Sequence, residues 1–134
     1  MIEMEVKPKR QPGILVVGPM ARTEPILRQL EKTGRFEFTY VLSLRKVETI
    51  LSTKPSVVVL HLAAEREQAD EAFSYLSLLR KQAPVVVMSS TPDMRLYLSA
   101  MTLGAFDYFT SYTPIEEASR VLDNAVSWSR RKAA

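Results

Sequence analysis

Short apolar runs alternate with amphipathic segments along most of the chain, and this alternation restricts the fold more than any other feature. Continuous apolar runs lie at 14–17, 57–60 and 85–88. Runs of this length, bounded by glycine, proline or polar residues, are typical of strands that are buried on both faces. Further strands are predicted at 36–40, where aromatic and polar residues alternate, and at 106–109. The pattern therefore predicts a sheet built from strands that lie far apart in the sequence.

The segments between these strands carry apolar residues at the spacing of a helix. Helices are predicted at 23–34, 43–54, 72–79, 91–104 and 114–128. Thr23 and Thr91 are expected to cap two of them, because a hydroxyl can accept a hydrogen bond from the first free backbone N–H groups. Pro92 and Asp93 strengthen the second of these predicted helix starts.

Strands that alternate with helices predict an α/β domain with a parallel sheet covered on both faces. Right-handed crossovers make a doubly wound, flavodoxin-like, five-stranded sheet of order 2-1-3-4-5 the natural closure. We expect one domain over residues 13–130, with a flexible N-terminal tail at 1–12 and a C-terminal tail at 131–134. The longest apolar runs are too short to span a bilayer, so no membrane contact is expected.

Composition excludes several classes of function. The chain has no cysteine, which excludes thiol catalysis and thiolate metal sites and suits a cytoplasmic location. The net charge of +3 comes from basic residues near the two ends, among them Lys7, Lys9 and Arg130 to Lys132. The body of the chain is close to neutral, so the basic face of a nucleic-acid binder is not expected.

Ligands of such sheets bind at the carboxyl ends of the strands, near the point where the strand order reverses. The residues expected at this edge include Gly18 and Pro19, His61, Ser89 and Ser111. This set contains no carboxylate pair, no lysine and no arginine. The edge is therefore poor in the groups that catalysis or metal binding needs, and no metal or cofactor is expected.

Three segments resemble the receiver domain of response regulators: Pro55–Leu62, Pro84–Ser90 and Gly104–Ser111. The spacing between them also agrees with that family, and the resemblance covers roughly residues 13–130. The Gly-Ala-Phe-Asp-Tyr run that begins at Gly104 is its most specific part. The resemblance implies the same flavodoxin-like fold and a function in two-component signal transduction or a phosphorelay.

The resemblance also implies where phosphoryl chemistry would lie. Receivers hold Mg²⁺ with an acidic pair after the first strand and accept the phosphoryl group on an aspartate after the third. Those positions match Gly18, Pro19 and His61, and Ser111 stands in the place of the family's lysine. The hydroxyl at Ser89 and the switch aromatic at Tyr108 are retained. These replacements predict a degenerate pseudo-receiver that binds no Mg²⁺ and is not phosphorylated.

The leading functional hypothesis is a signalling module that acts by phosphorylation-independent contact with a protein partner or with a second copy. The resemblance favours the last two helices and the fifth strand as the contact surface, because receivers use this face. Candidate residues are Tyr97, Met101, Tyr108 and Trp128, since tyrosine and tryptophan are favoured at interfaces. The alternative is that Met101 and Trp128 only fill the edge of the core.

Two other hypotheses remain at this point. A small-molecule sensor for a nucleotide or metabolite would use the less polar cleft that Gly18, Pro19 and Ser111 leave. An enzyme with His61 as general base is less favoured, because the pattern places no nucleophile and no carboxylate beside it. The simplest role of His61 is a hydrogen bond to a neighbouring loop, and no enzymatic activity is predicted.

Overall fold

The computed structural model describes residues 11–133 apart from 44–45, 47, 49–51 and 64–65. The described chain forms a five-stranded parallel sheet of order β2-β1-β3-β4-β5, which confirms the predicted fold class. The strands are β1 (Gly13–Val17), β2 (Glu37–Val41), β3 (Val57–Leu62), β4 (Val85–Ser89) and β5 (Asp107–Thr110). All neighbouring pairs are parallel, as crossover connections require.

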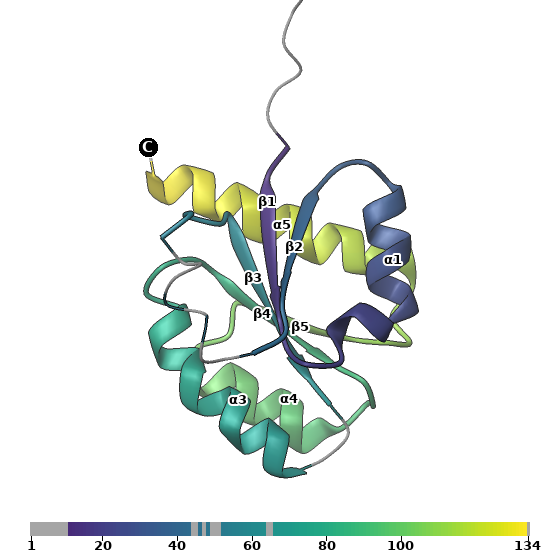
Figure 1. The fold of residues 1–134 in the computed structure, drawn as a ribbon, viewed down its shortest axis with the longest axis vertical. Helices are drawn as coiled ribbons and strands as arrows, with labels where there is room; N and C mark the ends of the chain where they lie inside the picture. Colours follow the sequence, from purple (N-terminus) through teal and green to yellow (C-terminus); the bar gives the residue numbers. More distant parts are fainter. Residues whose placement is uncertain (1–10, 44–45, 47, 49–51, 64–65, 134) are drawn as a thin grey trace, which may run out of the picture.

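Helices cover both faces of this sheet (Figure 1). They are α1 (Pro25–Lys32), α3 (Arg66–Leu79), α4 (Met94–Thr102) and α5 (Ile115–Ala133), with a short 3-10 turn η1 (Ala21–Thr23) before α1. Helices α1 and α5 lie on one face, and α3 and α4 lie on the other. The helix predicted at 43–54 includes residues 44–45, 47 and 49–51, which lie outside the described part of the chain. No helix among the described residues has the length and hydropathy to cross a membrane.

A hydrophobic core lies on each face of the sheet, which explains why the strand sequences are continuous apolar runs. Successive side chains of a strand point to opposite faces, so each apolar run supplies both cores. In β1, Ile14 and Val16 pack with α1 and α5, whereas Leu15 and Val17 pack with α3. Every residue of β3 and β4 is buried, which fits their positions near the centre of the sheet.

Two helix starts differ from the sequence prediction. Thr23 does not cap α1. It belongs to η1, where its hydroxyl donates to the carbonyl of Met20 at 2.7 Å, and Pro25 becomes the first residue of α1. Thr91 does not cap α4 either, because the carboxylate of Asp93 accepts the N–H of Arg95 at 2.8 Å.

The C-terminal helix extends past the boundary predicted for the domain. Helix α5 runs to Ala133, beyond residue 130, the predicted end of the domain. The basic residues Arg130, Arg131 and Lys132 form its last turn. Cations at this end interact favourably with the partial negative charge of the helix terminus, which explains why the helix includes them.

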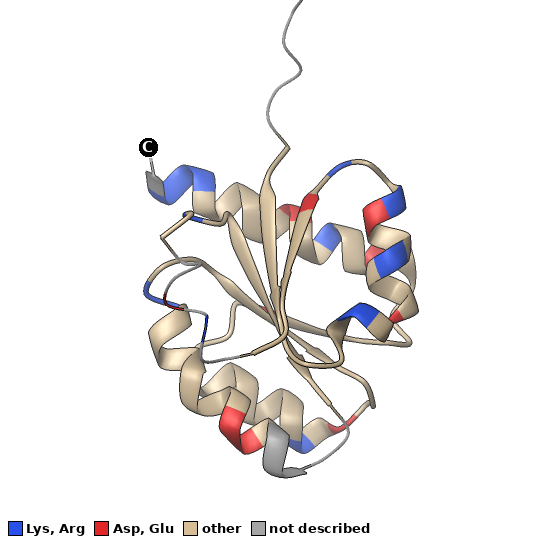
Figure 2. Cartoon of the chain, viewed as in Figure 1, with Lys and Arg blue, Asp and Glu red and all other residues tan. Residues whose placement is uncertain are grey.

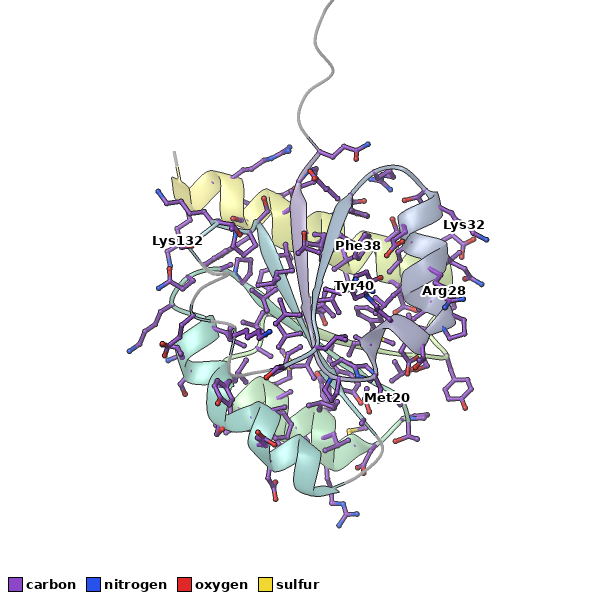
Figure 3. The ribbon with its side chains drawn as sticks, in the orientation of Figure 1. Met20, Arg28, Lys32, Phe38, Tyr40 and Lys132 are labelled. Atoms are coloured by element: carbon purple, nitrogen blue, oxygen red, sulfur yellow. The ribbon has the colours of Figure 1, made fainter. Side chains whose placement is uncertain are left out.

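Aromatic side chains of β2 fill the space between this edge strand and α1 (Figure 3). Phe38 and Tyr40 pack against the core on that face, and their rings stack with centroids 6.4 Å apart. The guanidinium of Arg22 lies 5.3 Å from the ring of Tyr40, and the Tyr40 hydroxyl donates to Glu31. These contacts hold η1 and α1 against the sheet. They therefore determine the direction of Glu24, the residue between η1 and α1.

Candidate functional site

The carboxyl ends of the strands form one edge of the sheet, where backbone hydrogen bonds join the loops. The N–H of Ser90 donates to the carbonyl of Leu62 at 3.1 Å. The N–H of Ser111 donates to the carbonyl of Ser89 at 3.0 Å. The loops after β3, β4 and β5 therefore lie side by side, as predicted for the ligand-binding edge of such a sheet.

Glu24 reaches this edge from the start of α1. Proline is favoured at the first position of a helix, and Pro25 holds that position here. Glu24 is thus the residue just before the helix, with extended backbone angles and no hydrogen bond from its side chain to the helix N–H groups. Its carboxylate is turned to the sheet edge instead, and the residue is only 8% exposed.

Four side chains meet at this carboxylate, and we call them the carboxylate cluster: Glu24, His61, Ser90 and Ser111. The Ser90 hydroxyl donates to Oε1 of Glu24 at 2.9 Å, and the Ser111 hydroxyl donates to Oε2. His61 Nε2 lies 3.2 Å from Oε1 of Glu24 and 3.1 Å from the Ser90 hydroxyl. Each oxygen of a buried carboxylate therefore has a partner, as stable burial of a charge requires.

The contacts determine the charge state of the cluster. Burial raises the pKa of Glu24, but hydrogen bonds from Ser111, Ser90 and His61 outweigh burial, and the pKa lies below its usual value. Burial lowers the pKa of His61 more than the Glu24 carboxylate raises it. At neutral pH Glu24 is ionised and His61 is neutral. Because an ionised carboxylate only accepts, we assign the ring proton to Nε2 of His61.

This assignment leaves Nδ1 of His61 as an acceptor, and the atom is buried without a hydrogen-bond partner. It lies next to Gly18, whose φ is +150°. A Cβ atom at position 18 would lie 2.9 Å from Cβ of His61 and 3.2 Å from its carbonyl oxygen. Gly18 is therefore required by the close approach of two loops, in the place where the receiver resemblance expects an acid.

The predicted site residues fall into two groups. Gly18, His61 and Ser111 lie together, but Ser89 does not face the carboxylate. The Ser89 hydroxyl donates to the carbonyl of Thr91 at 2.6 Å, and Ser90 takes the position at the carboxylate. The expectation that no carboxylate lies beside His61 is wrong, because Glu24 does. The Glu24-Pro25 pair marks the start of a helix in the sequence, but it does not indicate that the carboxylate turns to the sheet edge.

The cluster does not have the geometry of a nucleophilic triad. In such a triad the hydroxyl and the carboxylate bind opposite nitrogens of the histidine. Here Ser90 and Glu24 both contact Nε2 of His61, and Nδ1 has no partner. The side chain of His61 is also fully buried, which separates it from any substrate in solvent.

The cluster does not suit Mg²⁺, the metal that the receiver resemblance implies. Mg²⁺ prefers several carboxylate and water oxygens in octahedral geometry. Gly18 and Pro19 bring no side-chain oxygen, His61 is an imidazole, and both oxygens of Glu24 already accept hydrogen bonds. Within the described ranges, no three histidine, cysteine, aspartate or glutamate side chains are grouped to hold a metal.

A cavity of about 240 Å³ lies beside the cluster, between the loop after β1 and helix α3. Its lining includes Gly18, Pro19, His61, Glu71 and Ala72. Glu71 is the acidic residue of this lining. An occupant would therefore need hydrogen-bond donors or a positive charge rather than a phosphate.

The predicted contact surface is divided in the structure. The rings of Tyr97 and Tyr108 pack edge to face at 5.5 Å, and Met101 packs at the edge of the same core. Trp128 instead packs against Phe106, with ring centroids 6.0 Å apart. Tyr97 and Tyr108 therefore belong to a surface on α4 and β5, whereas Trp128 belongs to another part of the molecule.

Acidification is expected to lower the free energy of unfolding, starting near the ordinary histidine pKa of 6.5. The pKa of His61 is lower in the folded chain, so below about pH 6.5 the unfolded chain binds the extra proton. Stability is then lost as the pH falls toward the folded-state pKa. Glu24, whose pKa is also lowered, adds a further loss below its ordinary value of 4.5.

Urea unfolding at about pH 7.5 and about pH 5.5 measures this dependence. His61 is the only histidine, so the His61→Gln variant is expected to lose much less stability over that interval. An equal loss in the variant and in the wild type would contradict the assignment of a buried neutral imidazole.

Comparisons with known proteins agree with the fold. No family model and no curated protein matches the sequence. A response regulator from Thermotoga maritima superposes with a TM-score of 0.73 at 17% identity, covering 87% of this chain and 98% of that one. A signal receiver domain from Pseudomonas fluorescens, part of an HD domain-containing protein, gives 0.72 at 15% identity, with 91% and 99% covered. A receiver protein from Burkholderia phymatum gives 0.69 at 18% identity, with 87% and 96% covered. The predicted receiver fold is confirmed.

Proposed function

We propose that the chain is a receiver-type signalling domain that works without phosphorylation and without enzymatic activity, in the cytoplasm, by binding a protein partner or a second copy. The observation that carries this proposal is the buried carboxylate of Glu24. It lies beside His61 and Ser111, the positions that match the phosphoacceptor and the lysine of receivers.

Electrostatics supports the loss of phosphorylation. An entering phosphoryl group would bring negative charge next to an ionised carboxylate, with no metal ion or lysine to neutralise it. Two unit charges 4 Å apart repel by about 4 kcal/mol at an effective dielectric constant of about 20. His61 cannot offset this repulsion, because its lowered pKa keeps it neutral near pH 7.

The exposed apolar side chains of α4 support the proposed contact surface. Met94 is 68% exposed and Leu98 is 55% exposed, and Tyr97 lies between them in sequence. Tyr112, in the loop after β5, is 75% exposed. Grouped apolar side chains on a soluble domain often mark a protein-binding site. Receiver structures that share this fold make signalling by protein contact the natural function of such a surface.

Phosphodonors are expected to leave the protein unmodified. The ¹H–¹⁵N correlation spectrum is recorded with Mg²⁺, then with beryllofluoride, and the protein is incubated with acetyl phosphate. Peaks of His61, Ser90 and Ser111 are expected to stay in place, and the mass is expected not to change. Saturable shifts of these peaks, or a stable phosphoryl adduct, would contradict the proposal.

The contact surface is tested on the same samples by sedimentation velocity over a range of protein concentrations. If a second copy is the partner, association is expected to weaken strongly in the Leu98→Ser variant. The matched control is Met20→Ser, which replaces another exposed apolar side chain, on the loop after β1. A wild-type chain that stays monomeric assigns the surface to a different protein, and equal loss in both variants would exclude α4 as the contact site.

A second candidate function is a small-molecule sensor, favoured by the cavity of about 240 Å³ beside His61. The nearby charge of Glu24 and the lining carboxylate of Glu71 favour a small amine or another donor-bearing metabolite over a nucleotide. A specific ligand would raise the melting temperature by mass action. The Ala72→Leu variant would fill the cavity and is expected to abolish that rise, which a ligand bound elsewhere would survive.

A further inference from the structure

A second, larger cleft lies at the other end of the strands, where β4 begins and α5 ends. Its volume is about 570 Å³, within the range of small-molecule sites. We call it the basic cleft, and the residues that define it are Arg80, Lys81, Gly104, Phe106, Trp128 and Lys132. Figure 2 shows the basic turn after α3 and the basic end of α5 on the same side of the molecule.

The charge of this cleft is positive and has no acidic counterpart among the lining residues that the structure describes. Arg80 and Lys81 come from the turn after α3, and Lys132 comes from the last turn of α5. The ion pairs of the described residues involve Arg35, His61 and Arg95, and none of the cleft cations. Three cations that converge without a carboxylate create a site for an anion.

Arg80 packs against the backbone at Gly104, although the residue is exposed. Gly104 has a φ of +98°, and a Cβ atom there would collide with the guanidinium and lie 3.0 Å from Cδ of Arg80. The side chain of Arg80 therefore lies flat against the glycine. The guanidinium of an arginine is a planar fork that matches the oxygens of a phosphate.

The wall opposite the turn is aromatic. The Trp128 and Phe106 rings pack with centroids 6.0 Å apart, and Lys132 Nζ lies 4.8 Å from the Trp128 ring centroid. Trp128 and Lys132 are one helical turn apart, so they lie on the same face of α5. The two rings are inclined at 54° to each other, so the cleft has an angled aromatic wall beside its cations.

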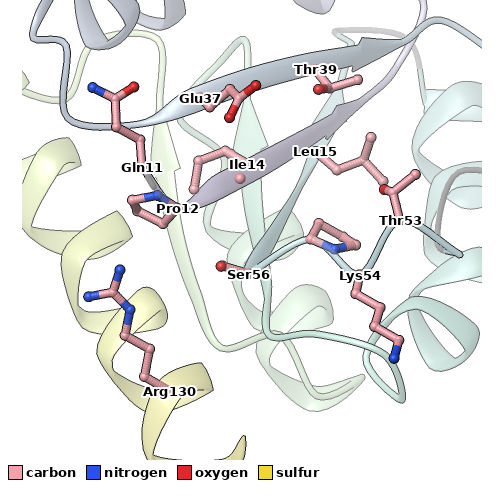
Figure 4. Close-up of a pocket in the computed structure, with 12 residues that line it drawn as sticks. Gln11, Pro12, Ile14, Leu15, Glu37, Thr39, Thr53, Lys54, Ser56 and Arg130 are labelled. Carbon is pink, nitrogen blue, oxygen red and sulfur yellow. The ribbon is translucent and has the colours of Figure 1, made fainter. Parts of the chain in front are cut away.

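A neighbouring cavity shows what distinguishes the basic cleft. The cavity of about 390 Å³ beside the first residues of β1 and β2 is lined by Glu37 as well as by Lys54 and Arg130 (Figure 4). Its charges are mixed, no aromatic side chain lines it, and the side chain of Lys54 points away from its centre. It lacks the combination of excess positive charge and an aromatic wall.

We propose that the basic cleft binds a small anion that carries an aromatic ring, of the nucleoside phosphate class. Arg80, Lys81 and Lys132 contact the phosphate oxygens, and the base lies against Trp128 and Phe106. This site is separate from the carboxylate cluster and has the opposite sign of charge. The binding does not depend on the proposed signalling function, because the cleft shares no residue with the cluster or with the exposed face of α4.

The test is a titration of the protein with ADP, followed by fluorescence. Trp128 is the only tryptophan, so the emission of the protein comes from a residue that lines this cleft. Saturable quenching by ADP is expected, with at least tenfold weaker binding of both adenosine and inorganic pyrophosphate. Pyrophosphate that binds as tightly as ADP would overturn the assignment to nucleosides, and absence of saturable quenching would overturn the site.

Charge-matched variants locate the binding. The Lys81→Gln/Lys132→Gln variant is expected to weaken ADP binding at least tenfold. The Arg28→Gln/Lys32→Gln variant has the same net charge but changes α1, on the opposite side of the molecule from Lys132 (Figure 3), and a change below twofold is expected. Equal weakening of ADP binding in the two variants would show that only unspecific charge attraction holds the ligand, and it would overturn the proposal. All four side chains are exposed, so both variants are expected to fold.

Discussion

Replacing Glu24 with alanine is expected to lower the free energy of unfolding by about 2–3 kcal/mol. The substitution leaves the hydroxyls of Ser90 and Ser111 and the Nε2–H of His61 without their common acceptor. Groups that lose a partner in a buried site carry a desolvation cost of about 1–3 kcal/mol each, and water that enters the space left by the carboxylate offsets part of it.

Urea unfolding of the wild type and two variants measures the effect. The Glu24→Gln variant keeps one carbonyl acceptor and is expected to lose about half as much stability, because a neutral acceptor makes weaker hydrogen bonds. Asp70→Ala, which removes an exposed acid on α3, is the control and is expected to change stability by less than about 0.5 kcal/mol. A similarly small effect of Glu24→Ala would show that solvent replaces the carboxylate freely, and would contradict the buried cluster.

The second large effect is expected at Gly18, where alanine should cost about 2 kcal/mol of stability. The φ of +150° is rare for residues with a side chain, and the added Cβ would lie 2.9 Å from Cβ of His61. Part of the crowding involves the carbonyl oxygen of His61, so it persists whatever side chain occupies position 61. Restoring an aspartate at position 18 would meet the same obstacle.

Gly13 provides the matched control, because it begins β1, the strand that Gly18 follows. A Cβ atom at Gly13 has no neighbour within 4 Å, and its φ is not positive. Gly13→Ala is therefore expected to be neutral or to stabilise by up to about 1 kcal/mol, since it restricts the unfolded chain. Equal thermal stability of the Gly18→Ala and Gly13→Ala proteins would contradict the close approach at the sheet edge.

The sheet could be predicted from the sequence because its strands are buried on both faces. Val57 to Leu60 and Val85 to Met88 form uninterrupted apolar runs only because helices cover both sides of β3 and β4. The starts of the helices were harder to predict from the sequence than the strands. Thr23 and Thr91 are suitable caps by their chemistry, but Pro25 and Asp93 set the helix starts.

The place of the site could be predicted, but its central group could not. Gly18 and Ser111 directly follow β1 and β5, and His61 lies near the carboxyl end of β3, so the topology alone brings them together. Glu24 lies beyond the 3-10 turn after β1, and its direction depends on how η1 and α1 pack. A pattern of residue types contains no information about that packing. The same limit applies to Trp128, which the sequence analysis grouped with Tyr97 although the two pack against different aromatic partners.

The partners of Glu24 come from distant parts of the chain, and this has a consequence for how the molecule folds. His61, Ser90 and Ser111 are separated from it by 37, 66 and 87 residues. A fragment that stops before the loop after β5 lacks Ser111, so Oε2 of Glu24 loses its partner, and only Oε1 keeps its contacts with His61 and Ser90. The cluster therefore favours the complete sheet over incomplete forms, in keeping with all-or-none folding.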